Sequence, residues 1–552
     1  MAEHHVYGPP GTGKSSYATR QIRRAAEAYG ADRVMACSFT KAAAVELATK
    51  EVDGEKADIP RQMIGTLHSL CYRALENPPL AEAHIGDFND LHPEYLLTGA
   101  AKPDVDDLGS NAEADASGTA ADGLRGQYDL LRARCADREA WPVAVQGFAK
   151  AWESWKDANG AFDYTDLIEH APAAPPGNPK VLFCDEAQDF NRLQYRLIRK
   201  WTASTDMTVM LADDDQCVYS FTGASPGDLI DADVPAGNRI VLKQSYRLPA
   251  AVHRYASAWI QQVEHRQRKE FLPRDHPGEV RAVDASLRFL DTEMGRIAAL
   301  AEAPGEPGVP PVMIVATCGY MLRGAIAQLR EAGLAFHNPW RPGRGDWNPL
   351  SKREGGASQR VSSFLAHEGG KPWWTMYNLA QWVPLLKAEG ILRRGAKAEI
   401  ERIAEEQPGY RPSLREIGER WIMTEALSIV SRETFPSAEA VRWFAANCLE
   451  PKRKPVAYAC EIARKALARG GDARQALAIG PRIVVGTAHS LKGSEASHVW
   501  LAPDLSPQSA EQWHRSVAGR DEIRRVFYVG MTRARESLTL LKPMGRLSVR
   551  LT

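Results

Sequence analysis

The sequence predicts an α/β protein with two lobes, each built on a parallel sheet and each carrying a mainly helical insertion. Three observations support this fold class. The strand-like run 4–7 precedes a glycine-rich loop and a good helix former at 16–28. The apolar run 181–184 reads as a buried strand and ends in two adjacent acids. After residue 238, further strand-like runs alternate with helical sequence, as a second parallel sheet with crossover helices requires.

The strand-like runs divide into two sets. The first set joins 4–7 and the acidic run with 33–38 and 207–211. The second set comprises 239–242, 312–316, 483–485, 499–501 and 537–541. We therefore expect a first lobe at 1–73 and 161–237, and a second lobe at 238–338 and 481–552. The stretches between them, 74–160 and 339–480, differ in character and are predicted to be insertions.

Each predicted insertion has its own pattern. The first begins with helical sequence and contains the segment 103–123, which carries six acidic residues and neither Lys nor Arg. Such a composition cannot bury enough apolar surface to offset the entropy of ordering, so it predicts a flexible loop. The second insertion is rich in sequence of helical period, and the helices expected there are 387–406, 414–431, 438–449 and 456–467.

Composition limits the classes of protein and partner. At 552 residues the chain is expected to hold several domains. Its 69 Lys and Arg balance 69 Asp and Glu, so any nucleic-acid surface must be a local patch. The eight cysteines show no C-x-x-C spacing, which disfavours a zinc ribbon or iron–sulfur cluster and fits reduced thiols. With no signal-like start and no run of membrane-spanning length, the expected location is cytoplasmic, without a membrane partner.

Two motifs carry the chemistry. Gly8-Pro-Pro-Gly-Thr-Gly-Lys14-Ser15 matches G-x-x-x-x-G-K-[ST], in which glycines let backbone N–H groups surround a phosphate chain. Asp185 and Glu186 follow a strand, where a P-loop protein holds magnesium and water. Together the motifs predict a nucleoside triphosphate, Mg²⁺ and an attacking water. The structural alternatives are a Gly/Pro surface turn before an ordinary helix, and acids that only solvate a strand end or cap a helix.

Further motifs follow in a fixed order along the chain. They are Ser38-Phe-Thr-Lys-Ala-Ala-Ala44, Gly65-Thr-Leu-His-Ser69, Phe162-Asp-Tyr-Thr-Asp-Leu167, Asp185-Glu-Ala-Gln-Asp189, Ala212-Asp-Asp-Asp-Gln-Cys-Val-Tyr-Ser-Phe221, Gln244-Ser-Tyr-Arg247, Gly486-Thr-Ala-His-Ser-Leu-Lys-Gly-Ser-Glu495 and Phe527-Tyr-Val-Gly-Met-Thr-Arg-Ala534. From Gly8 to Glu536, in patches, this series resembles the superfamily 1 helicases of the UvrD/Rep/PcrA type. The resemblance implies two RecA-like P-loop lobes.

The resemblance also implies a set of ATP-site residues. The phosphates would be held by Gly8, Pro9, Pro10, Gly11, Thr12, Gly13, Lys14, Ser15 and Ser16, and Mg²⁺ by Ser15 and Asp185. Glu186 would orient or deprotonate the attacking water, and Gln216 would sense the γ-phosphate. Arg247 and Arg533 would reach the γ-phosphate from the second lobe. Tyr246 would stack on the base and Glu495 would hold the ribose.

A DNA-binding set follows from the same resemblance. Its members are Phe39, Thr40, Thr66, His68, Tyr219, Phe221, Thr487 and His489. The aromatic members would stack on bases, which suits a protein that must accept any sequence, and the others would bond the backbone. Taken alone, each His is more often a structural residue than a ligand-binding one, and only the surrounding motifs favour the binding role. Phe221 and Thr222 stand where the family has Trp and Arg, and the family's upstream glutamine motif that contacts adenine is missing before Gly8.

The aromatic-basic stretch 340–347 and the pair at 373–374 have two readings, nucleic-acid contact or ordinary packing of the insertion, and packing is favoured.

The function implied is that of an ATP-dependent single-stranded-DNA translocase and helicase moving 3′ to 5′. The expected partners are single-stranded DNA and single-strand/duplex junctions, with RNA less favoured and with a monomeric or weakly self-associating chain. The alternative is a nucleic-acid-stimulated ATPase that remodels complexes without processive unwinding. Strand displacement by the purified chain distinguishes the two.

Overall fold

The computed structural model describes residues 2–56, 58–98, 119–350, 355–431, 434–449, 453–478 and 481–551. The chain folds as two compact units. Unit 1 comprises Met1–Val280 and Pro507–Ser537, and unit 2 comprises Arg281–Ser506 and Leu538–Thr552. The boundary runs through two strands, β7 (Glu279–Ala282) and β14 (Ala534–Leu540). These units do not coincide with the lobes predicted from the sequence, because residues 238–280 and 507–537 belong to the unit that holds the glycine-rich loop.

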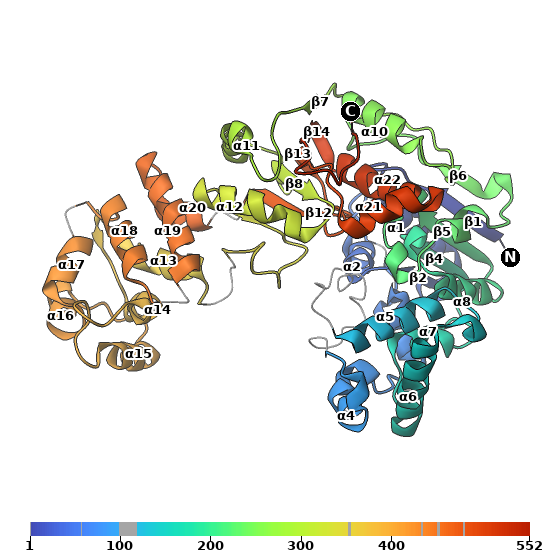
Figure 1. Cartoon of the computed structure of the whole chain (residues 1–552), viewed down its shortest axis with the longest axis horizontal. Helices are drawn as coiled ribbons and strands as arrows, with labels where there is room; N and C mark the ends of the chain where they lie inside the picture. The colour runs from blue at the N-terminus through green and yellow to red at the C-terminus, as the bar shows by residue number, and fades with distance from the viewer. Residues whose placement is uncertain are drawn as a thin grey trace. The chain divides into compact units, whose positions relative to one another are not determined.

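Unit 1 is built on a six-stranded sheet in the order β3-β2-β4-β5-β1-β6 (Figure 1). Its strands are β1 (Ala2–Tyr7), β2 (Val34–Ser38), β3 (Ile64–Thr66), β4 (Val181–Asp185), β5 (Met207–Ala212) and β6 (Arg239–Val241). Every neighbouring pair is parallel. The residues of β2 and β4 are buried throughout, as expected for central strands of a parallel sheet covered on both faces.

The strand at Arg239–Val241 corrects one expectation. The sequence places this run in the second lobe, because it follows the last motif of the first sheet and opens the second set of apolar runs. In the structure it pairs with β1, with His5 opposite Arg239 and Tyr7 opposite Val241, and so forms the edge of the first sheet. A three-residue edge strand carries too little pattern to reveal its partner. The other strand-like runs of both sets form strands within the sheets to which they are assigned.

The carboxyl ends of the parallel strands meet at one edge of the sheet. Ser38 lies in register with Asp185, and Tyr7 lies in register with Ala212. Each of these residues ends its strand next to a motif of the sequence. The loop after β1, the acids at the end of β4 and the turn after β5 therefore lie close together. Open parallel sheets bind ligands at this edge.

The first insertion is helical, and its core is aromatic. Its main helices are α4 (Ile85–Leu91), α5 (Ala120–Ala133) and α6 (Val143–Asn159). Phe88 packs edge-on against Trp152 with ring centroids 4.9 Å apart. Of the predicted flexible loop, residues 103–118 lie outside the described residues. The remainder, 119–123, is ordered: a Thr119/Asp122 capping box starts α5, and Asp122 also accepts a bond from the Thr98 hydroxyl at 2.8 Å. At this end of the segment the capping-box spacing produces an ordered helix start, although the acidic composition predicts a flexible loop.

Buried charges join this insertion to the lobe. Arg132 on α5 and Lys156 on α6 both donate to Asp163, at 3.0 and 2.6 Å, and both pair with Asp166. Asp163 also N-caps α7 (Tyr164–Glu169). Burial alone would raise the pKa of Asp163, but the two cations outweigh it and hold that pKa well below its usual range. The insertion is therefore fixed to the lobe through ionised groups with almost no exposure.

Unit 2 holds most of a second six-stranded sheet, in the order β7-β14-β13-β8-β12-β9. Its further strands are β8 (Val312–Ala316), β9 (Phe336–His337), β12 (Ile483–Thr487) and β13 (Ala496–Leu501). The ladders of β12 with β8 and β9, and of β13 with β8, are parallel. Helices α11 (Asp291–Glu302) and α12 (Arg323–Glu331) accompany this sheet. The predicted fold class, α/β with two parallel-sheet lobes, is confirmed.

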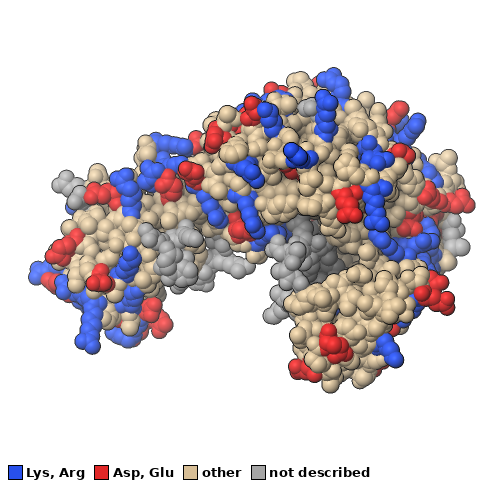
Figure 2. Space-filling model, in the orientation of Figure 1, with Lys and Arg blue, Asp and Glu red and all other residues tan. Residues whose placement is uncertain are grey.

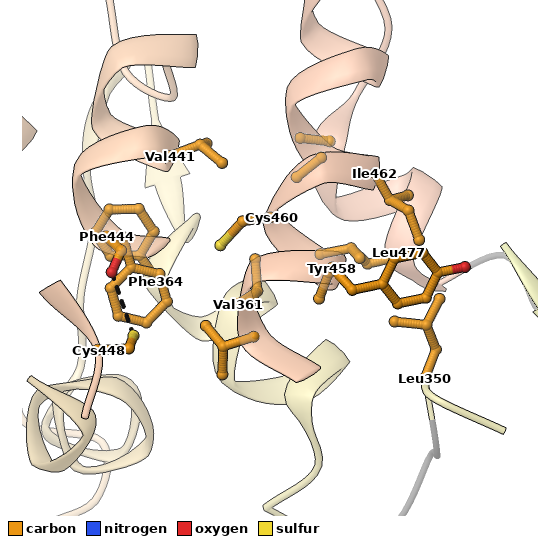
Figure 3. Packing of buried hydrophobic residues seen from close by; sticks show 14 of the residues in the cluster. Leu350, Val361, Phe364, Val441, Phe444, Cys448, Tyr458, Cys460, Ile462 and Leu477 are labelled. Atoms are coloured by element: carbon orange, nitrogen blue, oxygen red, sulfur yellow. Dashed lines mark hydrogen bonds between the residues drawn. The ribbon is translucent and has the colours of Figure 1, made fainter. Parts of the chain in front are cut away.

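The second insertion is a bundle of short helices. They are α13 (Ala357–Phe364), α14 (Met376–Trp382), α15 (Ala396–Glu406), α16 (Leu414–Arg420), α17 (Thr424–Val430), α18 (Ala438–Asn447), α19 (Arg453–Ala468) and α20 (Ala473–Ala478). Figure 3 shows the centre of their core, where Phe364 and Phe444 stack with centroids 4.4 Å apart and the Cys448 thiol donates to the Phe444 carbonyl.

Two helices expected here differ from those observed. The helix predicted at 387–406 begins only at Ala396, because Gly390 and Gly395 take positive φ values of 69° and 81° and form turns. The helix predicted at 414–431 is split between Arg420 and Thr424, where Trp421 and Ile422 enter the core.

The tryptophans of the insertion mostly pack. Trp347 and Trp374 are buried, whereas Trp340 and Trp373 are partly exposed. None of the eight cysteines, all of which lie in the described ranges, forms a disulfide. No helix within those ranges is long and apolar enough to cross a membrane.

Replacing Asp163 by Asn should destabilise unit 1. Asn still accepts the α7 capping bond, but Arg132 and Lys156 lose their shared carboxylate, and breaking a buried ion pair costs about 3–5 kcal/mol. We expect the thermal midpoint, followed by circular dichroism, to fall by more than about 5 °C. Because the native pKa of Asp163 is lowered, its contribution is present above about pH 4 and is lost as the pH falls further.

The matched control is Arg138→Ala, which removes a solvent-exposed partner of Glu153 in the same insertion. An exposed pair contributes at most about 1 kcal/mol, so the midpoint should barely move. Equal effects of the two substitutions would show that the buried network does not hold the insertion.

Candidate functional site

The glycine-rich loop connects β1 to α1 (Lys14–Tyr29). Its first residue is tied to the neighbouring strand, since the Gly8 N–H donates to the Ala212 carbonyl at 2.9 Å. The Thr12 hydroxyl donates to the Pro9 carbonyl at 2.8 Å and closes the loop on itself. Gly13 precedes α1 with a φ of 75° and provides no side-chain cap for the helix. The amide groups of the first turn are therefore oriented as in a helix amino end that binds an anion.

A second segment of unit 1 lies against this loop. The Ser245 hydroxyl donates to the Pro10 carbonyl at 2.8 Å, and the Tyr246 N–H donates to the Gly11 carbonyl at 2.8 Å. At Gly11, where φ is 72°, an added Cβ would lie 2.3 Å from the Cβ of Arg247. The loop can approach Arg247 this closely only because residue 11 is glycine. The Tyr246 side chain is 66% exposed and lies beside Gly13, so its ring is accessible for stacking.

Lys14 is held by the two acids that follow β4. Its ammonium group lies 2.5 Å from Glu186 Oε1 and 3.8 Å from Asp185 Oδ1. Burial by itself lowers the pKa of Lys14, but Glu186 and Asp185 outweigh it and raise that pKa, so Lys14 is a cation. Burial raises the pKa of Asp185 to about 6, although Lys14 opposes the shift. Glu186 has a φ of 53°, a conformation that side chains rarely adopt and that is typical of functional sites.

The oxygen groups near Lys14 fit a magnesium ion. Asp185 Oδ1 is buried and has no hydrogen-bond partner among the described residues, and the same holds for Ser38 Oγ at the end of the neighbouring strand. Ser15 follows Lys14 on α1. Hydroxyl and carboxylate oxygens are the donors that Mg²⁺ prefers. Within the described residues no cluster of three or more His, Cys, Asp or Glu side chains could hold a metal.

A line of hydrogen bonds leads from Glu186 across the sheet edge. Gln188 donates to Glu186 Oε2 at 2.5 Å and accepts from the Asp213 N–H at 2.9 Å. The Asp213 carboxylate accepts from the Gln216 amide at 2.7 Å. The Gln216 side-chain carbonyl accepts from Arg533 at 2.8 Å.

Three of the predicted residues, Glu186, Gln216 and Arg533, are thus connected through two that the sequence did not single out. Gln188 and Asp213 both lie within motifs described above, so their place in those motifs could have indicated a role in the site. Arg533 follows α22 (Val517–Met531) and is buried, and its guanidinium also donates to the Val529 carbonyl. Arg247 and Arg533 were expected from the second lobe; both lie in unit 1, together with Lys14.

The three predicted DNA-binding aromatic residues form one cluster. Phe39 stacks on Tyr219 with centroids 5.4 Å apart, and Tyr219 meets Phe221 edge-on at 5.8 Å. Tyr219 is buried, whereas Phe221 is 42% exposed, so Phe221 offers the accessible ring.

The polar members of the DNA-binding set take structural positions. Thr40 and Thr66 N-cap α2 (Lys41–Thr49) and α3 (Leu67–Ala74), and His68 packs edge-on against Tyr164. In unit 2, Thr487 ends β12 and its hydroxyl accepts from the Ser490 N–H at 3.2 Å. His489 and Glu495 follow in the connection to β13. The visible face mixes both signs of charge, which agrees with a balanced chain (Figure 2).

Comparison with known protein families agrees with this geometry. Residues 2–234 match the UvrD/REP helicase N-terminal domain, and residues 444–543 match the UvrD-like helicase C-terminal domain. The two matches together cover more than half of the chain. The chain belongs to the UvrD/Rep family of superfamily 1 helicases.

Curated members of the UvrD/Rep family are distant relatives. The ATP-dependent DNA helicase UvrD1 of Mycobacterium tuberculosis is 28% identical over 268 residues, which cover 43% of this chain and 34% of the relative. The putative ATP-dependent DNA helicase YjcD of Bacillus subtilis is 22% identical over 262 residues, covering 44% and 34%. The probable DNA helicase II homolog of Mycoplasma capricolum is 24% identical over 295 residues, covering 49% and 40%. The aligned part thus spans about a third of the first two relatives.

Replacing Gly11 by Ala should disrupt the loop of this UvrD/Rep-type chain. The added Cβ would collide with Arg247 at a position where positive φ is already unfavourable for Ala. We expect the affinity for a fluorescent ATP analogue, measured by anisotropy, to fall by more than about tenfold, as a loss of about 1.4 kcal/mol requires.

Gly54→Ala is the matched control, because Gly54 has a φ of 82° and nothing lies within 4 Å of an added Cβ. It carries the backbone strain without the collision, so nucleotide affinity should be unchanged. An equal loss in both variants would assign the effect to strain alone.

Proposed function

We propose that the chain is an ATP-driven single-stranded-DNA translocase and helicase that moves 3′ to 5′. The observation that carries the proposal is the continuous line of contacts from Lys14 through Glu186, Gln188, Asp213 and Gln216 to Arg533. It connects a phosphate-binding loop to a buried arginine. Two relatives, the ATP-dependent DNA helicase UvrD1 and the putative ATP-dependent DNA helicase YjcD, support the same activity.

ATP binding would exchange the partners of Lys14. In the structure the ammonium group is neutralised by Glu186 at 2.5 Å. Negative phosphate oxygens at the amino end of α1 would attract Lys14 away, as in other P-loop NTPases. Glu186 would then be free to accept a hydrogen bond from the attacking water, and the neighbouring Gln188 would keep its carboxylate oriented. The Glu186 carboxylate, which neutralises Lys14 at rest, would thereby become the group that acts on the water in catalysis.

Mg²⁺ would supply charge neutralisation to the phosphate chain. Ser15 and Asp185 would be its protein ligands, and the buried Asp185 Oδ1, which has no hydrogen-bond partner within the described ranges, supports that assignment.

Positive charge at the γ-phosphate would come from Arg247 and Arg533. An arginine finger contributes about 10³ to 10⁵ in rate, or roughly 4–7 kcal/mol. Arg247 lies against the loop at Gly11, and Arg533 contacts Gln216. Tyr246 would stack on the base through its exposed ring. Glu495 of unit 2 would hold the ribose.

Coupling to DNA would pass along the chain after Gln216. Tyr219 and Phe221 follow it by three and five residues and form the aromatic cluster with Phe39. A shift of Gln216 on hydrolysis would therefore move the ring of Phe221, on which a base would stack with about 1–3 kcal/mol. Thr40, Thr66, His68, Thr487 and His489 would contact the strand's backbone.

Directional unwinding tests the proposal. A duplex with a 3′ single-stranded tail should be unwound with ATP and Mg²⁺, and its 5′-tailed counterpart should be unwound little. Fluorescence release of the displaced strand measures both, and unwinding should weaken as salt rises because phosphate contacts release counterions. Preferential unwinding of the 5′-tailed duplex would overturn the direction. DNA-stimulated hydrolysis without displacement of either strand would favour the remodelling ATPase, and stimulation by RNA alone would overturn the DNA assignment.

Glu186→Gln should separate binding from turnover. The side chain keeps its size and the phosphate-binding loop is untouched, but the water loses its base. We expect ATP and DNA affinities within about threefold of wild type and a kcat at least about 10² lower. Glu27→Gln is the control, because Glu27 is exposed on the same helix as Lys14. Near-normal hydrolysis by the Glu186 variant would refute its role.

A further inference from the structure

A lysine outside all the motifs buries its side chain against the aspartate turn, Asp213 to Asp215, which leads to Gln216. The Lys269 side chain is 1% exposed. Its ammonium group lies 2.9 Å from Asp213 Oδ1 and 2.9 Å from Asp215 Oδ2, and it also pairs with Asp214. The three carboxylates are themselves almost fully buried. Burial by itself lowers the pKa of Lys269, but the three aspartates outweigh it and raise that pKa. Lys269 therefore supplies positive charge to all three consecutive acids, which allows them to lie in the interior.

The segment 264–269, which ends at Lys269, is bonded on two sides. Toward the turn, Arg266 makes a two-pronged pair with Asp215, and the Gln267 N–H donates to Asp214 at 2.9 Å. Toward α22, Asp521 accepts from the Glu264 N–H at 3.0 Å.

Arg525 of α22 joins the two sides. Its guanidinium donates both to the His265 carbonyl, at 2.6 Å, and to the Asp214 carbonyl, at 2.8 Å. The segment 264–269 thus connects the aspartate turn, Asp213 to Asp215, to α22, the helix that leads to Arg533.

The two oxygens of Asp213 have different partners. Oδ1 is held by Lys269, and Oδ2 accepts from the amide of Gln216, whose carbonyl oxygen accepts from Arg533. We propose that Lys269 is a positioning residue for hydrolysis, because it fixes Asp213 and thereby holds Gln216 against Arg533. The inference rests on the proposed function. A purely structural ion pair would stabilise the fold without affecting the chemical step separately.

Lys269→Met removes the charge and retains much of the apolar stem. It also leaves three buried carboxylates facing Arg266 alone, so this variant can lose stability as well as activity. Asp214→Asn/Lys269→Met removes one of those carboxylates while Asn still accepts the Gln267 bond. The double variant should therefore recover the thermal midpoint of the wild type, although Asp213 stays unsupported.

The decisive measurement is steady-state ATPase activity with oligothymidylate, alongside the affinity for a fluorescent ATP analogue. In the double variant we expect kcat to fall by about tenfold or more, because small misplacements of a catalytic group cost that much, with KM and nucleotide affinity within about threefold. Lys180→Met, which removes the exposed pair with Asp206, is the control and should change neither. A double variant that melts and hydrolyses ATP like wild type overturns the inference, and so does one that fails to fold.

The two proposals fail separately. If the wild-type chain shows no hydrolysis stimulated by DNA, the proposed function fails. If the wild type hydrolyses ATP, Glu186→Gln does not, and the double variant keeps the wild-type kcat, only the inference about Lys269 fails.

Discussion

The site depends on the parallel register of four strands. Because β1, β2, β4 and β5 run in the same direction, their carboxyl ends lie at one edge of the sheet. The glycine-rich loop, Phe39, Asp185 and the aspartate turn therefore lie at that edge. Reversing a single strand would move one of these groups to the opposite edge. The long insertion between β3 and β4 leaves this register intact, since it leaves the sheet after α3 and returns through α7. The sheet therefore positions these groups, and the insertion does not change their positions.

Burial of charge is the second constraint, and the chain meets it by supplying a cation for each acidic group. Lys14 faces Asp185 and Glu186, Lys269 faces the aspartate turn, and Arg132 with Lys156 faces Asp163. Removing a cation from any of these groups would leave carboxylates in a medium that solvates them poorly. The three buried groups differ in what they do. The pairs of Asp163 attach an insertion, whereas those of Lys14 and Lys269 lie where the proposed chemistry occurs. Burial of an ion pair does not distinguish these roles, but the hydrogen bonds that lead to Gln216 do.

Much of the site could be predicted from the sequence because its residues lie in short motifs with local causes. The loop at Gly8 and the acids at the end of β4 follow from strand, loop and helix order, and the strands β1 and β4 that lead to them were predicted from their apolar runs. The short strands β3, β7 and β9 were not predicted. Lys269 could not be predicted, since its partner Asp214 lies 55 positions away and no local pattern marks it. Arg239–Val241 was assigned to the wrong sheet for the related reason that strand partnership is non-local. Asp122 shows the opposite failure, in which composition concealed a capping box.

Under the proposed function, the resting contact between Lys14 and Glu186 would link nucleotide affinity to catalysis. The ion pair at 2.5 Å would have to be broken before phosphate could bind Lys14, so part of the binding energy of the nucleotide would be used to release Glu186. The left-handed backbone at Glu186 is strained. Its side chain accepts a hydrogen bond from Gln188, which in turn accepts one from the Asp213 N–H. Under the proposed function, the released carboxylate would therefore stay oriented. Such a site would keep Glu186 neutralised by Lys14 until ATP is bound, while Gln216 and Arg533 are already in contact in the structure without nucleotide.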